Sequence, residues 1–164
     1  MYLMAFTISI QGCGSLGPVA GVAPPVPSPP RAERAERTER SEALLQALLA
    51  LGVDYRYGGA APATGFDCSG LVAHIYREAW GMRLPPNTAA QSRIGVPVSL
   101  AELQAGDLVF YNTLKRPYSH VGIYLGEGKF VHAPRTGAQV RIELMQSAYW
   151  TQRFNGARRI EPPL

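Results

Sequence analysis

The chain has 164 residues, of which 46% are hydrophobic and 17% are charged, and its formal net charge is +4. This size and balance indicate one modest globular domain with additional sequence, and they argue against two domains. The positive charges are spread singly and form no basic stripe with interleaved aromatic residues, so we do not expect nucleic-acid binding.

The N-terminal part of the chain is typical of a targeting and tethering region. Residues 1–12 form an apolar run that resembles the hydrophobic part of a secretory signal and is too short to span a bilayer, which takes roughly 20 apolar residues. The segment that ends in Gly12-Cys13 resembles the lipobox of bacterial lipoproteins, which predicts lipidation of Cys13. An ordinary secretory signal with an incidental cysteine is the alternative. Residues 14–30 are rich in proline, so we expect a semi-extended linker.

A helix is predicted where the folded domain begins. Residues 31–40 alternate Arg and Glu in a three-residue repeat, which indicates a solvated helix start. The leucines at positions 44, 45, 48 and 49 share one face, which we expect to dock on the core, and Gly52 provides a C-terminal stop. We therefore assign residues 13–40 to the lipobox cysteine, the linker and the charged helix start, and residues 41–164 to the domain.

A cysteine is expected at the start of the next helix. Asp67 is a favoured N-cap residue, and apolar residues from Leu71 to Ala79 recur at helical spacing, which places Cys68 at the N-terminus. Free backbone N–H groups and the helix dipole favour a thiolate there, so we interpret Cys68 as a nucleophile. The alternative is a buried, inert cysteine. His74 lies off the apolar stripe, and we assign it to the surface or to a side contact.

The second half of the chain has the pattern of an antiparallel sheet. A short helix capped by Asn87 or Thr88 and reaching Arg93 comes first. Strands are then predicted at residues 108–111, 119–125, 129–133, 139–143 and 153–160. Helices followed by antiparallel strands predict an α+β domain.

Two histidines lie on the hairpin formed by residues 119–125 and 129–133. With a three-residue loop, Gly122 faces His132, and His120 is the diagonal neighbour of His132 on the same face. A two-residue loop would place the two histidines on opposite faces. Because a nucleophilic cysteine needs a base and a group that orients the base, we predict an odd-length loop or a bulge. One cysteine and two histidines lack the spacing of a zinc finger or ribbon, so we expect neither metal nor cofactor.

From about Leu51 to Ile160, the chain resembles the NlpC-type cell-wall cysteine peptidases. Several motifs occur in that family's order and spacing, and such a coincidence is far more specific than one short pattern. Pro86 departs from the arginine that often follows Leu-Pro in the family. The motifs are Tyr55-Arg56-Tyr57-Gly58-Gly59, Phe66-Asp67-Cys68-Ser69-Gly70-Leu71-Val72, Leu84-Pro85, Gly106-Asp107-Leu108-Val109-Phe110, Ser119-His120-Val121-Gly122-Ile123-Tyr124 and Phe130-Val131-His132-Ala133.

The resemblance implies a compact papain-like domain in which N-terminal helices pack on an antiparallel sheet. It implies hydrolysis of amide bonds in peptidoglycan stem peptides, either the γ-D-glutamyl-diaminopimelate bond or a cross-link. It assigns Cys68 as nucleophile, His120 as base, His132 as the polar third member and Tyr55 to the oxyanion, together with the backbone N–H of Cys68.

Three neighbours of the catalytic candidates are predicted to bind substrate, namely Asp67, Ser69 and Ser119. The expected partner is peptidoglycan, and the expected location is the cell envelope, in the periplasm, with a monomer anchored to the outer membrane through Cys13. Because fold does not fix function, two alternatives remain. One is a catalytically silent cell-wall-binding module, and the other is a thiol acyltransferase or amidase that acts on another substrate.

Overall fold

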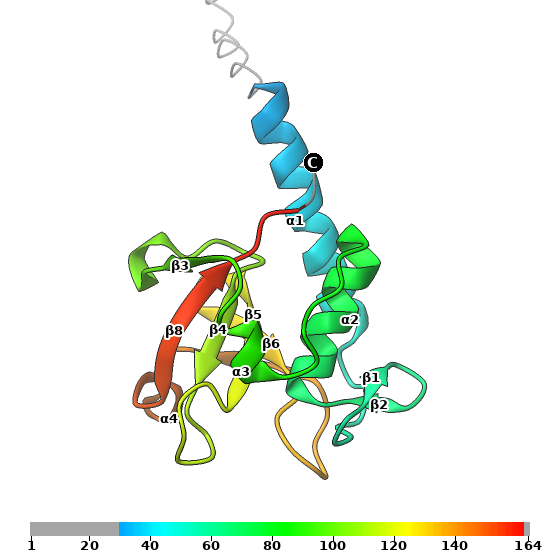
Figure 1. The fold of residues 1–164 in the computed structure, drawn as a ribbon, viewed down its shortest axis with the longest axis vertical. Coiled ribbons are helices and arrows are strands. Elements are labelled where there is room, and N and C mark those ends of the chain that lie inside the picture. The colour runs from blue at the N-terminus through cyan, green and yellow to red at the C-terminus, as the bar shows by residue number, and fades with distance from the viewer. Residues whose placement is uncertain (1–29, 163–164) are drawn as a thin grey trace, which may run out of the picture.

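The computed structural model describes residues 30–162, which form helices packed against an antiparallel sheet (Figure 1). The six strands lie in the order β3-β8-β4-β5-β6-β7, and all neighbouring strands are antiparallel. The predicted α+β class is therefore confirmed. The strands are β3 (Val96–Val98), β4 (Leu108–Tyr111), β5 (His120–Gly126), β6 (Lys129–His132), β7 (Arg141–Leu144) and β8 (Phe154–Arg159).

The predicted helix that begins with Cys68 is confirmed as α2 (Cys68–Trp80). Asp67 is the N-cap residue, and Gly81 ends the helix in the left-handed conformation with a φ of 63°. The face that packs on the sheet through β5 is fully buried. Burial of each large apolar side chain on that face contributes about 1.5–3 kcal/mol. These side chains are Leu71, Val72, Ile75 and Tyr76.

The first helix, α1 (Arg31–Leu49), packs against α2 with a face that we did not predict. Ala43, Ala47 and the C-cap residue Ala50 are buried and Leu44 is half-buried, whereas Leu45, Leu48 and Leu49 are 48%, 49% and 68% exposed. The prediction that the leucine face docks on the core is therefore wrong. Small side chains let the two helices approach closely, and the indole N–H of Trp80 donates a 2.9 Å hydrogen bond to the backbone oxygen of Glu39 across this contact.

Alternation along the strands divides the apolar side chains between two cores. Leu108 and Phe110 of β4 belong to the core under α2, whereas Val109 and Tyr111 belong to a second core with Trp150. The second core lies on the other side of the sheet and also contains Phe130 and Ala157.

Several short elements connect the longer ones. The predicted cap at Asn87 is confirmed, because its side chain accepts a hydrogen bond from the backbone N–H of Ala90. The sequence pattern did not predict β1, β2 or β3, which are too short to show alternation. The short elements are β1 (Ala60–Ala61), β2 (Gly65–Phe66), α3 (Thr88–Gln91), the 3-10 turn η1 (Leu100–Glu102) and α4 (Ala148–Thr151).

The signal-like segment, the lipobox with Cys13 and the linker up to residue 29 lie outside the described residues. Within residues 30–162, no helix is both long enough and apolar enough to cross a membrane.

Candidate active site

The start of α2 is fixed by the carboxylate of Asp67. One oxygen accepts hydrogen bonds from the backbone N–H of Gly70 at 2.7 Å and from the hydroxyl of Ser69 at 2.9 Å. The other oxygen accepts from the backbone N–H of Gly58 at 2.9 Å. A Cβ at position 70 would lie 2.0 Å from the backbone oxygen of Gly59, so only glycine allows this close approach. These contacts hold Cys68 in the first turn of the helix.

The thiol of Cys68 is neutral in the resting site. Burial, followed by the charge of Asp67, raises the pKa of Cys68 to about 11. Hydrogen bonds from the backbone N–H groups of Val121, Ser69 and Cys68 itself act in the opposite direction but do not outweigh burial. The helix start therefore favours the thiolate, as expected, but burial has the larger effect on the pKa of Cys68. The contact with Val121 also places the sulfur next to the strand residue that follows His120.

The two histidines lie on one face of the β5–β6 hairpin, as predicted. Ile123 pairs with Val131 and Tyr124 with Phe130, and a bulge precedes the pairing of Gly126 with Lys129. This bulge sets the register in which Nε2 of His120 lies 2.7 Å from Nδ1 of His132.

The hairpin leaves no room for a side chain at Gly122. A Cβ at this position would lie 2.7 Å from the ring of Phe130 and 3.3 Å from the Cβ of His132. The absence of a side chain therefore allows the two histidine rings to occupy this face.

Both histidines are neutral near pH 7. Burial, followed by the neighbouring His132, lowers the pKa of His120 to about 3. Burial, followed by the charge of Arg141, lowers the pKa of His132 to about 3. A neutral histidine can act as a general base, because it is free to accept a proton.

The carboxylate of Glu143, which sequence analysis did not identify as a site residue, lies next to the histidine pair. Nε2 of His132 lies 3.5 Å from Oε1 of Glu143, and Trp150 stacks on the ring of His120 at 5.7 Å. The sequence predicts Glu143 only as the end of a strand, but β7 pairs with β6 so that His132 faces Arg141. Glu143 is then the diagonal neighbour of His132. No sequence pattern indicated this pairing, because it depends on the register between two strands joined by a long loop.

Of the two tyrosines before the cysteine helix, Tyr55 is the one near the thiol. Burial, followed by the charges of Cys68 and Asp67, raises the pKa of Tyr55. The backbone of Tyr55 also forms a parallel β-bridge with that of Phe66, two residues before Cys68. Tyr57 is 88% exposed and points to solvent.

The remaining candidates form hydrogen bonds within the protein. Besides its bond to Asp67, the hydroxyl of Ser69 donates to the backbone oxygen of Pro86. The hydroxyl of Ser119 accepts from the backbone N–H groups of Thr113 and Leu114. These contacts shape the loops around the site, and the predicted roles in substrate binding stay predictions. His74 makes a side contact with Arg77, as expected.

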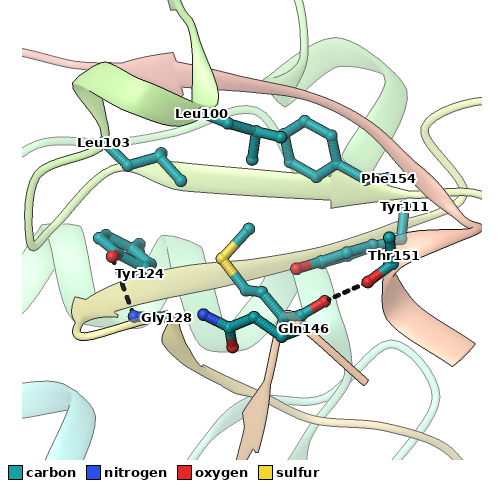
Figure 2. Close-up of a pocket in the computed structure, with 9 residues that line it drawn as sticks. Leu100, Leu103, Tyr111, Tyr124, Gly128, Gln146, Thr151 and Phe154 are labelled. Atoms are coloured by element: carbon teal, nitrogen blue, oxygen red, sulfur yellow. Dashed lines mark hydrogen bonds between the residues drawn. The ribbon is translucent and has the colours of Figure 1, made fainter. Parts of the chain in front are cut away.

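Two cavities flank the second core. Figure 2 shows one of about 420 Å³, into which the aromatic and aliphatic side chains of Tyr124, Phe154 and Leu103 project. None of the residues that line it is Cys68, His120 or His132. The other cavity, of about 400 Å³, is lined in part by Glu143 and Trp150 and is therefore the one that adjoins the histidine pair.

A helix-borne thiol beside two sheet-borne histidines is the arrangement of a papain-like cysteine hydrolase. The chain belongs to the NlpC/P60 family, whose model matches residues 52–159.

Relatives of this chain include enzymes named as murein endopeptidases. The chain is 41% identical over 124 residues to the murein DD-endopeptidase MepH of Escherichia coli K12, which covers 74% of this chain and 46% of MepH. It is 44% identical over 109 residues to the E. coli K12 murein DD-endopeptidase/murein LD-carboxypeptidase MepS, covering 66% of this chain and 56% of MepS. The chain is 39% identical over 112 residues to the gamma-DL-glutamyl hydrolase of Bacillus subtilis 168, and the match covers 68% of this chain and 27% of that hydrolase. The chain thus spans between about a quarter and just over half of these relatives.

Solved structures show the same fold. An NlpC/P60 family protein from Bacillus cereus superposes with a TM-score of 0.70 at 34% identity, covering 75% of this chain and 40% of that one. The NlpC/p60 domain of the peptidoglycan hydrolase SagA superposes with a TM-score of 0.64 at 31% identity, and the match covers 74% of this chain and 98% of the SagA domain.

Proposed function

We propose that this protein is a cysteine endopeptidase that hydrolyses amide bonds in peptidoglycan stem peptides. The observation that carries the proposal is the 2.7 Å contact between the buried rings of His120 and His132, beside the thiol at the start of α2. The named activities of MepH and MepS support the choice of peptidoglycan as substrate.

We assign the direction of proton transfer from the hydrogen bond between the two histidines. Because Nε2 of His120 is bonded to His132, Nδ1 of His120 is the nitrogen that takes the proton from Cys68. The sulfur then bonds to the carbonyl carbon of the substrate, and the protonated His120 gives its proton to the leaving amine. Water, deprotonated by His120, next attacks the acyl-enzyme, which breaks the carbon–sulfur bond, releases the new carboxylic acid and restores the thiol.

The oxyanion formed in both steps requires donors near the sulfur. We assign this role to the hydroxyl of Tyr55 and to the backbone N–H of Cys68, the pair that the position of Tyr55 near the thiol supports. Asp67, Ser69 and Ser119 then support the walls of the site, where substrate would contact them.

The location and assembly of the protein are part of the same proposal. A lipid on Cys13 would attach the chain to the outer membrane on the periplasmic side, and the domain would act on peptidoglycan as a monomer. The basic surplus of the domain, twelve Lys and Arg against eight Asp and Glu over residues 43–164, suits an anionic polymer.

Digestion of purified sacculi by the wild type and by Cys68→Ala tests this function. We expect the wild type to release muropeptides and the variant to release none, since the variant lacks the nucleophile while its fold and melting temperature are retained. Mass spectrometry of the products identifies the bond, because cleavage of the γ-D-glutamyl-diaminopimelate bond and of a cross-link give fragments of different mass.

Three outcomes would contradict the proposal. Full activity of Cys68→Ala would exclude the thiol mechanism. Retention on sacculi by the wild type without any release of fragments would indicate a silent binding module. Transfer of an acyl group to an added amine, with no hydrolysis, would indicate an acyltransferase.

A further inference from the structure

A buried nitrogen at the end of the histidine pair has an incomplete environment. His132 is fully buried, and within residues 30–162 its Nε2 has no hydrogen-bond partner. Oε1 of Glu143 lies 3.5 Å from this nitrogen, which is within ion-pair distance but longer than a good hydrogen bond. A buried polar atom in this position is costly unless a partner approaches it during function.

Glu143 is held in place by two other residues. Oε1 accepts a hydrogen bond from Nε of Arg141 at 2.6 Å, and Oε2 accepts one from the indole N–H of Trp150. Trp150 also stacks on His120, so one side chain contacts both ends of the row formed by His120, His132 and Glu143. Since both carboxylate oxygens are engaged, the carboxylate cannot turn away from His132.

Proton positions follow from this geometry. When His120 is protonated, its Nε2–H must donate to Nδ1 of His132, since that is the contact at 2.7 Å. Nδ1 of His132 then carries a lone pair, so the ring proton of His132 sits on Nε2, facing the carboxylate. A negative charge at this point stabilises positive charge on the pair.

We infer that Glu143 is a positioning residue, which keeps the proton of His132 on Nε2 and stabilises the imidazolium of His120 when it takes the thiol proton. This inference rests on the proposed function, because it assigns Glu143 a part in the same proton transfer. Glu143 contacts neither the thiol nor the position of the substrate carbonyl, and it acts through His132.

Other charged and titratable groups around Glu143 determine how strongly its charge acts on the histidine pair. The charge of Glu143 raises the pKa of His120, whereas that of Arg141 lowers the pKa of His132. Arg135 lines the cavity of about 400 Å³ that Glu143 and Trp150 also line. Tyr111, from β4, stays neutral, because burial, followed by the charge of Glu143, raises its pKa.

The test replaces the carboxylate by an amide of the same size. Glu143→Gln is expected to lower kcat on sacculi about tenfold with KM unchanged, a part of the 10²–10⁴-fold that a general base supplies. The rate of alkylation of Cys68 by iodoacetamide at pH 7 is expected to fall by a similar factor. Nitrogen-15 NMR of the histidine rings should show His132 protonated on Nε2 in the wild type and a mixture of tautomers in the variant.

Two further variants separate charge from structure. Glu127→Gln removes an exposed carboxylate that pairs with Lys129 on the β5–β6 turn, and it should match the wild type in every measurement. Trp150→Phe keeps an aromatic ring beside His120 but removes the N–H that holds Glu143. We expect it to lower kcat and the alkylation rate in the same direction as Glu143→Gln, by a smaller factor.

Alkylation and NMR need no peptidoglycan, so the two proposals can fail separately. If the wild type cleaves no peptidoglycan while Glu143→Gln slows alkylation and shifts the tautomer of His132, the proposed function fails and the role of Glu143 stands. If Glu143→Gln leaves the alkylation rate and the tautomer unchanged, the inference is overturned, whatever happens to hydrolysis.

Discussion

Cys68 shows how burial and local dipoles compete at one residue. The N-terminus of α2 and three backbone N–H groups favour the thiolate, yet burial and Asp67 raise its pKa to about 11. His120, with a pKa lowered to about 3, is neutral as well. Both groups are neutral at rest, so the thiolate and the imidazolium form together when a carbonyl carbon is attacked.

Acid should destabilise the protein through its buried histidines. His132 has an ordinary pKa of 6.5 in the unfolded chain and about 3 in the fold. Between these values the unfolded chain binds more protons than the native state, so stability falls as the pH falls through this window. We expect His132→Asn to lose less unfolding free energy than the wild type between pH 7 and pH 4, by on the order of 2–3 kcal/mol, in urea titrations.

A variant of the third histidine is the control for that measurement. His74 on α2 is only partly buried, and burial lowers its pKa less deeply. His74→Asn should therefore keep most of the acid loss seen in the wild type. An equal loss in the wild type and in His132→Asn would show that the buried pair does not drive acid unfolding.

Residues with a local pattern could be found from the sequence, and residues placed by tertiary contacts could not. The N-cap at Asp67 and the alternation through His120 are local, and they located the thiol and one histidine strand correctly. Glu143 and Trp150 approach His132 only because β7 and α4 fold back after a loop. The extent to which burial raises the pKa of Cys68 could not be predicted either, since burial cannot be seen from the helix start alone.

At the scale of elements, the hairpin was predictable and the docking of α1 was not. The hairpin is constrained, because a one-residue slip would move every side chain to the other face. α1 carries an alanine stripe and a leucine stripe, and hydrophobicity favours the leucines. Close approach to α2 favours the alanines, a condition that only the packed pair of helices imposes.

Substitutions on the two faces of α1 should differ sharply in cost. Ala47 is fully buried against α2, so Ala47→Leu would overpack the contact and lower the unfolding free energy by about 1–3 kcal/mol. Leu48, at 49% exposure, should tolerate Leu48→Gln within about 0.5 kcal/mol. Chemical denaturation of both variants measures this difference. A larger loss for Leu48→Gln than for Ala47→Leu would reverse the assignment of the docking face.

At the scale of the whole molecule, Asp107 joins segments that are far apart in the sequence. Its buried carboxylate accepts hydrogen bonds from Nε and Nη2 of Arg159 at 2.9 and 2.8 Å, and from the backbone N–H of Gln104 at 2.8 Å. Arg40 of α1 approaches the same carboxylate at 4.0 Å. This junction ties the first helix and the last strand to the entrance of β4.

Removing that carboxylate should destabilise the fold without touching the thiol site. Asp107→Ala leaves Arg159 without its partner, and we expect the unfolding free energy to fall by about 3 kcal/mol. Arg40→Ala removes the 4.0 Å contact with Asp107 and an ion pair with the exposed Glu161, and it should cost less than about 1 kcal/mol. Urea titration compares the two. A loss for Asp107→Ala no greater than that for Arg40→Ala would show that the junction adds little.

The antiparallel packing of α1 on α2 also sets how far the thiol stands from whatever precedes the domain. Trp80, at the end of α2, contacts Glu39 in the middle of α1, while Cys68 begins α2 at the opposite end. In Figure 1, the N-terminal part of α1 extends beyond the rest of the domain. At 1.5 Å per residue, the 19 residues of α1 span about 28 Å. The chain therefore enters at one end of the molecule and presents its nucleophile at the other.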